Sequence, residues 1–172
     1  LYLYLSFRPE SPLFRLFLIS ESRTGFFIEV SQGQWWRLWT PAFLHFSVLH
    51  ILFNMLWLKD LGRIYEYQRG SLSFAFFFVV CAGLSNVAQY VVQGPYFGGM
   101  SGVVYGLLGY LWMFKKFRPE SEFSLPKADI YLMIGWFFLC MTGLMGNIAN
   151  TAHCLELVVG MVFGIWLAGI EE

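Results

Sequence analysis

Apolar residues gather into five long runs along the chain, and short polar or charged segments separate them. The runs cover about residues 43–61, 71–92, 99–116, 128–145 and 149–169. A helix needs roughly 20 predominantly apolar residues to cross a bilayer, and each run approaches that length. The pattern therefore predicts five membrane-spanning helices.

The first 42 residues follow a different pattern. Prolines and glycines interrupt them, and arginines and glutamates are scattered through them. A short apolar stretch at 13–19 and the later tryptophans Trp35 and Trp36 are typical of a segment that lies in the membrane interface. We therefore divide the chain into an external interfacial loop segment, residues 1–42, and a transmembrane core, residues 43–172.

The composition supports a membrane protein. Hydrophobic residues make up 58% of the chain and charged residues 13%, whereas a soluble domain carries about 25% charged residues. Eleven basic and eleven acidic residues give zero net charge, which indicates no surface for nucleic acid. The predicted fold class is an all-α polytopic membrane protein.

Loop charges predict the orientation of the spans. The connections near 59–70 and 114–129 carry lysines and arginines, whereas those near 93–98 and 145–149 carry no charged residue. Basic loops stay on the cytoplasmic side, although the four arginines of the first segment weaken this count. With this orientation, the first span enters from outside, and the third and fifth spans begin outside.

This orientation places a few polar residues at one depth near the outer face. They are His50 and Asn54 of the first span, Ser101 at the start of the third, and His153 near the start of the fifth. Polar groups at membrane depth are costly and mark functional sites. We therefore expect these four residues to converge.

Ser101 and His153 together indicate nucleophilic catalysis. A serine hydroxyl is a weak nucleophile until a neighbouring base takes its proton, and imidazole suits that role near neutral pH. No aspartate lies near the outer face, so a Ser–His dyad fits better than a triad. Tyr105, four residues after Ser101, faces the same way and could pack on the imidazole. Alternatively, Ser101 is a small residue that lets two helices pack closely, and Tyr105 is an ordinary aromatic residue of the core.

His50 and Asn54 are spaced i, i+4 and share one helix face. Both side chains can donate hydrogen bonds to a developing oxyanion, together with the backbone N–H of Ser101. Alternatively, His50 and Asn54 hold neighbouring helices together through polar contacts. His45 is interpreted as structural. The spacing of the histidines and the lack of a carboxylate disfavour zinc, so we expect no metal and no cofactor.

Glycines on two spans predict a close helix pair. Small residues four apart let two backbones approach, which would hold the serine against the histidine. These glycines are Gly102 and Gly106 on the third span, and Gly160 and Gly164 on the fifth.

Several motifs, taken in order, resemble a known family. They are Trp36-Arg37, His50-Ile-Leu-Phe-Asn54, Glu66, Gly98-Gly99-Met-Ser101-Gly102-Val-Val-Tyr105-Gly106, and Asn150-Thr-Ala-His153 with Gly160. Over about residues 37–169 the chain resembles the bacterial type of rhomboid intramembrane serine protease. The resemblance implies a rhomboid-like bundle of six core helices, so that one span is expected ahead of Leu1.

The resemblance also implies an activity, partners and a location. The expected reaction is cleavage of transmembrane protein substrates within or beside their membrane helix, without cofactor. The expected location is the lipid bilayer of a bacterial inner membrane, with the active site toward the periplasm.

Site roles follow from the same resemblance. Ser101 matches the nucleophile and His153 the base. The other matched roles are the oxyanion hole (His50, Asn54 and the Ser101 amide), supporting residues (Tyr105, Gly99 and Gly102), a substrate gate (Phe53 and Trp136), a loop-anchoring pair (Arg37 and Glu66), and a cap over the site (Leu144 to Ile148).

Glu156 departs from the family pattern, which has glycine at that position. We expect its carboxyl to obstruct the close approach of two helices and to disturb the site. The alternative is that Glu156, three residues after His153, orients the imidazole as an acid partner.

Two other classes of function stay open at this point. An inactive rhomboid-like protein could bind transmembrane helices without cutting them, although the chain retains both Ser101 and His153. A channel or transporter would need charged residues along a path, and Glu156 is the only charged residue well inside a predicted span.

Overall fold

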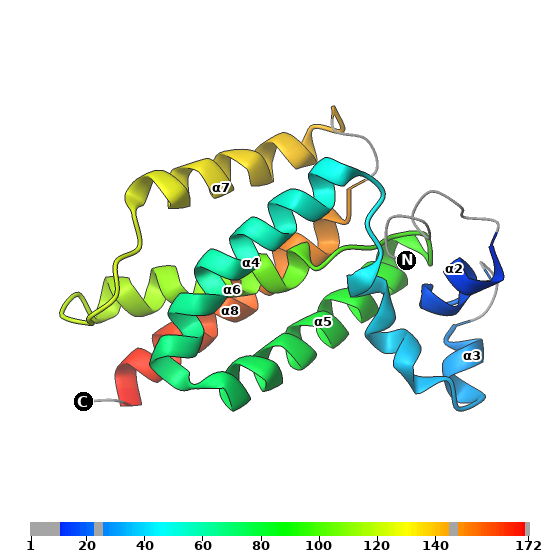
Figure 1. Cartoon of the computed structure of the whole chain (residues 1–172), viewed down its shortest axis with the longest axis horizontal. Helices are drawn as coiled ribbons and strands as arrows, with labels where there is room; N and C mark the ends of the chain where they lie inside the picture. Colours follow the sequence, from blue (N-terminus) through cyan, green and yellow to red (C-terminus); the bar gives the residue numbers. More distant parts are fainter. Residues whose placement is uncertain (1–10, 23–25, 145–147, 171–172) are drawn as a thin grey trace.

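The computed structural model describes residues 11–22, 26–144 and 148–170, and these residues form helices and no strand. The long helices are α4 (Val48–Arg69), α5 (Ser71–Gln93), α6 (Ser101–Phe117), α7 (Lys127–Met141) and α8 (Asn150–Ile170). The short elements ahead of them are α2 (Pro12–Phe17), α3 (Ile28–Ser31), η1 (Trp35–Leu38) and η2 (Thr40–Phe43). The short elements lie together at one end of the long helices (Figure 1). The described residues thus confirm the all-helical prediction.

Helix α6 is the centre of the bundle. Its side chains are almost entirely buried, and Leu107, Leu108 and Leu111 have no exposed surface. Helices α4, α5 and α8 contact it along its length. A helix that is apolar all round can be buried in this way because its neighbours, rather than lipid or water, cover every face.

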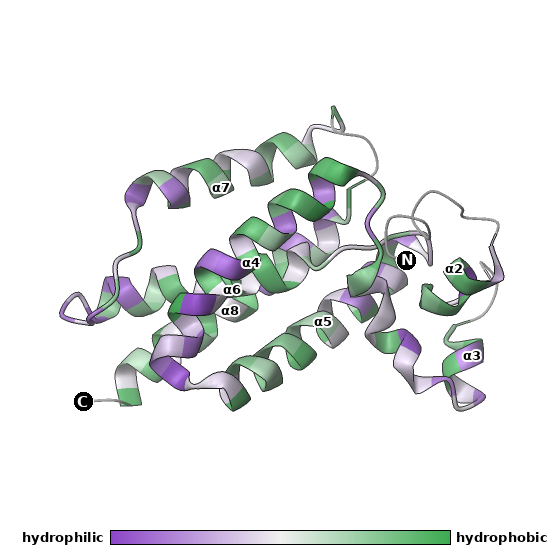
Figure 2. Ribbon diagram, viewed as in Figure 1, coloured by the Kyte–Doolittle hydropathy of each residue, from purple (hydrophilic) through white to green (hydrophobic). Residues whose placement is uncertain are grey.

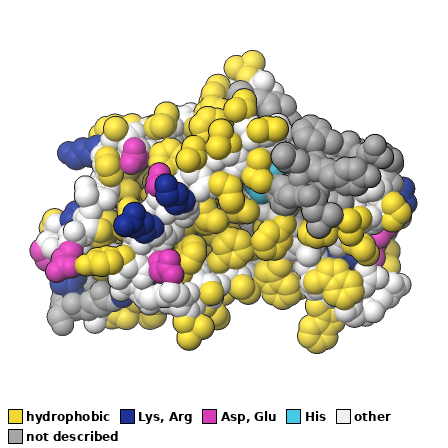
Figure 3. All heavy atoms as spheres, in the orientation of Figure 1, with side chains coloured by type: hydrophobic (Ala, Val, Ile, Leu, Met, Phe, Trp, Pro, Cys, Tyr) yellow, Lys and Arg dark blue, Asp and Glu magenta, His cyan; other side chains and the backbone are white. Residues whose placement is uncertain are grey.

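The surrounding helices turn apolar side chains outward. Leu72 and Phe76 of α5 and Val162 of α8 are among the large hydrophobic residues on the surface. By length and composition, α5 and α8 are the two described helices that could each cross a membrane. Hydrophilic positions concentrate toward the end of α4 that leads into α5 (Figure 2), and hydrophobic side chains gather over the middle of the face drawn in Figure 3.

Glycines bring the backbones of α6 and α8 into direct contact. A Cβ atom added at Gly160 would overlap the carbonyl group of Gly106, and one at Gly164 would overlap the carbonyl of Tyr110. The predicted close approach of the third and fifth spans is therefore confirmed. Gly102 has a different neighbour: a Cβ there would lie 2.7 Å from the Ser85 Oγ of α5.

The predicted spans match the helices to within about four residues at each end, except for the first span, which differs at both ends. Helix α4 begins at Val48 rather than near residue 43, because the Ser47 hydroxyl accepts a hydrogen bond from the backbone N–H of His50 and caps the helix. It continues to Arg69, beyond the apolar run, and Gly70 ends it. His50 therefore lies in the first turn of α4. The span expected ahead of Leu1 stays a prediction.

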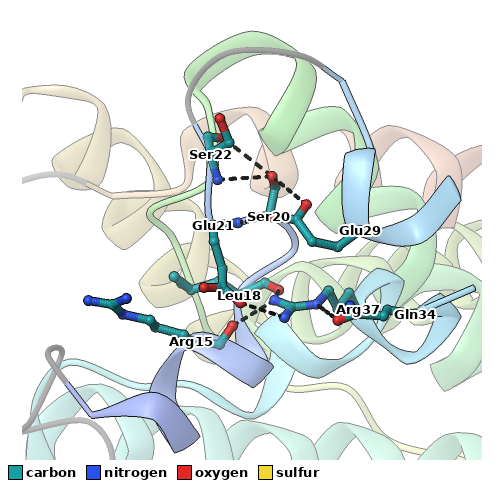
Figure 4. A network of polar contacts seen from close by, with 8 residues as sticks. All are labelled: Arg15, Leu18, Ser20, Glu21, Ser22, Glu29, Gln34 and Arg37. Carbon is teal, nitrogen blue, oxygen red and sulfur yellow. Dashed lines mark hydrogen bonds and ion pairs between the residues drawn. The ribbon is translucent and has the colours of Figure 1, made fainter. Parts of the chain in front are cut away.

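Arg37 anchors the segment that precedes α4. Its guanidinium is 1% exposed and donates to the carbonyl oxygens of Arg15 at 2.6 Å and Leu18 at 2.9 Å (Figure 4). It also donates to Gln34 and forms an ion pair with Glu21 at 2.8 Å. One buried side chain thus ties α2 to η1.

The predicted pairing of Arg37 with Glu66 is wrong. Glu66 lies near the far end of α4, 18 residues beyond its first residue, which is about 27 Å along the helix axis. There its carboxylate accepts a hydrogen bond from the Ser71 hydroxyl and joins α4 to the start of α5. The motif order in the sequence could not show that the two residues belong to opposite ends of the bundle.

Gly160→Ala tests the backbone contact. We expect it to lower the free energy of unfolding by about 1–3 kcal/mol, because the added methyl must push α6 and α8 apart. Gly169→Ala makes the same chemical change on α8 where no atom lies within 4 Å, so it serves as the matched control. Thermal unfolding in detergent measures both variants, and equal transition temperatures would contradict the contact.

Arg37→Leu tests the loop anchor. We expect a loss of about 3–5 kcal/mol, because two buried carbonyl groups and a carboxylate lose their partner. Glu21→Gln removes only the half-exposed end of the ion pair, so its effect should stay below about 1 kcal/mol. Comparable losses in the two variants would show that the ion pair, rather than the carbonyl contacts, holds the segment.

Candidate active site

The turn before α6 places Ser101 at the first residue of that helix. Gly99, two residues earlier, has a φ of +120°, a backbone conformation that favours glycine. A Cβ atom at Gly99 would also lie 2.7 Å from the Cε1 atom of His50. Glycine is therefore required at residue 99 for both backbone conformation and space, and the turn presents the Ser101 hydroxyl to α8.

His153, in the first turn of α8, is buried and contacts the serine directly. Its Nε2 atom lies 2.6 Å from the Oγ atom of Ser101. The ring of Tyr105 lies 4.7 Å from the imidazole, centroid to centroid, and its hydroxyl donates to the carbonyl of Met133 on α7. The structure thus brings Ser101, His153 and Tyr105 together as the sequence predicts.

His50 and Asn54 border the same turn. The position of a Cβ at Gly99 lies 2.8 Å from His50 Nε2 and 3.7 Å from Asn54 Nδ2. Asn54 Nδ2 donates one hydrogen to the His50 carbonyl at 3.1 Å, and an amide nitrogen carries a second hydrogen that can serve another acceptor. An imidazole nitrogen and an amide donor therefore flank the residues that lead into Ser101.

His45 supports His50 from the loop ahead of α4. Its ring is buried and lies 4.7 Å from the ring of His50. Burial, and then the neighbouring His50, lowers the pKa of His45 to about 3, so the imidazole is neutral at ordinary pH. The sequence indicated a structural role for His45 but not this contact.

The two residues predicted as a gate face each other across α4 and α7. The ring centroids of Phe53 and Trp136 lie 5.8 Å apart, and both side chains remain partly exposed. Helix α7 lies at the edge of the bundle in Figure 1, and its Cys140 carbonyl accepts a hydrogen bond from Asn150 at the start of α8. Of the predicted cap, Leu144 is exposed, and residues 145–147 lie outside the described residues.

Glu156 does not separate α6 from α8. Its side chain has no exposed surface and passes the glycine face of α6, with Cγ 3.6 Å from the Cβ position of Gly102 and Oε2 3.4 Å from that of Gly106. The Cys81 thiol borders the same space. The expected obstruction is therefore wrong, because the side chain turns toward α5 through room that the glycines leave.

The carboxyl of Glu156 also does not bind the histidine. Neither of its oxygens makes a hydrogen bond of regular geometry with the described residues, and the Nδ1 atom of His153 likewise has no partner among them. The alternative role of Glu156 as an acid partner thus receives no support from the geometry.

Helix α5 carries a row of polar residues that the sequence pattern did not single out. Ser85, Asn86 and Gln89 are all buried, although they lie in the middle of an apolar run. Asn86 Nδ2 donates to the Leu38 carbonyl, and Gln89 contacts the start of α8. The signal was present, since polar side chains inside a membrane span are costly and need partners.

The chain is similar to known proteins over most of its length. The family model described as "Rhomboid domain" matches residues 32–170. The chain is 39% identical over 139 residues to "Rhomboid protease GlpG" of Pectobacterium atrosepticum, which is 80% of this chain and 50% of that protein. It is 39% identical over 134 residues to the Yersinia pestis (strain Pestoides F) protein of the same name, covering 77% of this chain and 48% of that protein. The chain thus spans about half the length of the curated relatives it matches.

Glu156→Met tests the interpretation of the buried carboxyl. We expect it to raise the free energy of unfolding by about 1–3 kcal/mol, because an apolar side chain of similar volume replaces a buried carboxyl whose neighbour, the Cys81 thiol, is a weak hydrogen-bonding group. Because the carboxyl does not contact His153, labelling of Ser101 by a fluorophosphonate should stay within about threefold of wild type, and Glu156→Gln should label similarly. A loss of labelling in both variants with the fold intact would restore the acid-partner role.

Proposed function

This chain belongs to the rhomboid family, and we propose that it is a serine endopeptidase that cleaves membrane proteins inside the bilayer. The observation that carries the proposal is the 2.6 Å contact between Ser101 Oγ and His153 Nε2. A nucleophile and a base within hydrogen-bond reach are the minimum that covalent acyl transfer requires.

The proposed reaction begins with attack of Ser101 Oγ on the carbonyl carbon of the substrate peptide bond. The hydroxyl proton passes to His153 Nε2, and the carbonyl oxygen becomes an oxyanion. The imidazolium then gives its proton to the leaving amine nitrogen as the C–N bond breaks. Water attacks the resulting acyl-enzyme, with His153 again as the base, and releases the acid product and the free serine.

The oxyanion needs donors that are fixed before the reaction. His50, Asn54 and the backbone N–H of Ser101 are the proposed donors, since the first two side chains border the Gly99 turn. Loss of one such side-chain donor costs about 10²–10³ in rate.

A dyad, rather than a triad, fits the surroundings of His153. Its Nδ1 atom is buried and has no hydrogen-bond partner among the described residues, so a third acid does not orient the ring there. The ring of Tyr105 beside the imidazole supplies an apolar support instead.

The proposed substrates are transmembrane or juxtamembrane segments of other membrane proteins. The partly exposed Phe53 and Trp136, which meet between α4 and α7, suit a lateral entrance from lipid. The proposed location is a bacterial inner membrane with the site toward the periplasm, because the basic loops that precede α5 and α7 lie at the opposite end of the spans.

The test uses the full-length protein in detergent with a single-span substrate and a fluorophosphonate probe. We expect Ser101→Ala to abolish labelling and to lower cleavage by at least about 10³-fold. Ser121→Ala, in a loop on the far end of α6, is the matched control and should behave as wild type.

Cleavage that persists in Ser101→Ala would exclude the proposed nucleophile. A folded wild-type protein that neither cleaves nor labels would favour the second candidate, a rhomboid-like protein that binds transmembrane helices without cutting them.

A further inference from the structure

Helix α5 carries buried polar side chains that the proposed reaction does not use. Within this apolar helix, Asn86 and Gln89 are each 2% exposed. Polar groups buried at membrane depth cost free energy unless hydrogen bonds satisfy them. Their partners therefore show what these residues hold in place.

Gln89 reaches the start of α8. Its Oε1 atom accepts a hydrogen bond from the backbone N–H of Ala152 at 3.2 Å, and its Nε2 atom donates to Gln93 at 2.8 Å. Gln93 Nε2 in turn lies 3.5 Å from the hydroxyl oxygen of Thr151. Two glutamines of α5 thus contact two consecutive residues in the first turn of α8.

The hydrogen bond between Gln89 and Ala152 gives a partner to a backbone N–H that has no acceptor within α8. The first four backbone N–H groups of a helix have no acceptor within that helix, and Ala152 is the third residue of α8. Gln89 supplies the acceptor from a neighbouring helix, as a capping side chain does from within its own. Ala152 directly precedes His153, so this bond fixes the backbone beside the base.

The dyad has little tolerance for movement at this point. His153 Nε2 and Ser101 Oγ are 2.6 Å apart, and a hydrogen bond between such atoms is lost within about 1 Å of displacement. A misplacement of that size in a reacting group can cost about 10²-fold in rate.

We propose that Gln89 is a positioning residue that holds the first turn of α8 so that His153 stays within reach of Ser101. This role rests on the proposed peptidase function. Gln89 acts through the backbone of Ala152 and does not itself contact the reacting atoms.

Asn86 offers a matched control on the same helix. It lies three residues before Gln89 and is equally buried, and its Nδ2 atom donates to the Leu38 carbonyl at 2.9 Å. It therefore makes one buried bond to a backbone group, as Gln89 does, but binds the segment ahead of α4 rather than α8.

The experiment compares Gln89→Leu with Asn86→Leu in the full-length protein in detergent. We measure the thermal transition, kcat and KM for a single-span substrate, and the second-order rate of fluorophosphonate labelling. We expect Gln89→Leu to lower kcat and the labelling rate by about 10–100-fold, with KM within about threefold. Asn86→Leu should lower the transition temperature by a similar amount and leave the labelling rate within about threefold.

Two further variants keep the test decisive. Gln89→Glu retains an acceptor oxygen at the same reach and should restore most of the labelling rate that Gln89→Leu loses. Gln89→Asn keeps the amide but shortens the side chain by one methylene, so it should label slowly, and it replaces the leucine variant if that variant does not fold.

Wild-type labelling in both Gln89→Leu and Gln89→Asn would overturn the proposal, as would equal losses in Gln89→Leu and Asn86→Leu. These results differ from failure of the proposed function itself. In that case the wild-type protein would not label or cleave, or Ser101→Ala would remain active, and the positioning role would fall with it.

Discussion

The backbone contact between α6 and α8 is the constraint on which the site depends. Lipid is as apolar as the helices, so the hydrophobic effect does little to press two spans together, and close packing must do so. Gly106 and Gly160 allow that packing because any side chain at Gly160 would overlap the opposing carbonyl group. Ser101 and His153 lie one to two turns from this contact on the same two helices. Their 2.6 Å separation is therefore a consequence of where the glycines are.

Helix α5 adds the directional bonds that glycine packing lacks. Val79 accepts a hydrogen bond from the Trp39 indole, Asn86 donates to Leu38, and Gln89 accepts from Ala152. One helix thus holds the segment ahead of α4 and the start of α8. Helix α7 contacts the bundle through the Phe53–Trp136 ring pair and through hydrogen bonds from the Tyr105 hydroxyl and the Asn150 amide.

Local pattern and family resemblance predicted much of this arrangement, within limits that have physical causes. Apolar runs located the helices because hydrophobic length must match the bilayer, and intramembrane polar residues located Ser101 and His153 because such residues are costly. The predicted pairing of Arg37 with Glu66 is wrong because the sequence does not show which residues of the first segment pack against Arg37. Arg37 instead binds the carbonyl of Arg15 in α2 and that of Leu18 directly after it, in a segment that carries no motif. Gln89 was overlooked because its partner is a backbone N–H, which every residue except proline possesses.

Glu156 shows that a residue that departs from the family motif need not change the packing of the helices. A carboxyl at a glycine position predicts separation of the helices if the side chain points along the line between their axes. In the structure, the backbones of α6 and α8 meet at Gly160, one turn after Glu156. The Glu156 side chain instead passes Gly102 and Gly106 toward Cys81. Its cost therefore falls on stability, as a buried carboxyl beside a weakly polar thiol, and the Ser101–His153 pair stays within hydrogen-bond reach. The glycines of α6 thus have two effects: they let the backbone of α8 approach closely, and they leave room for the side chain of Glu156.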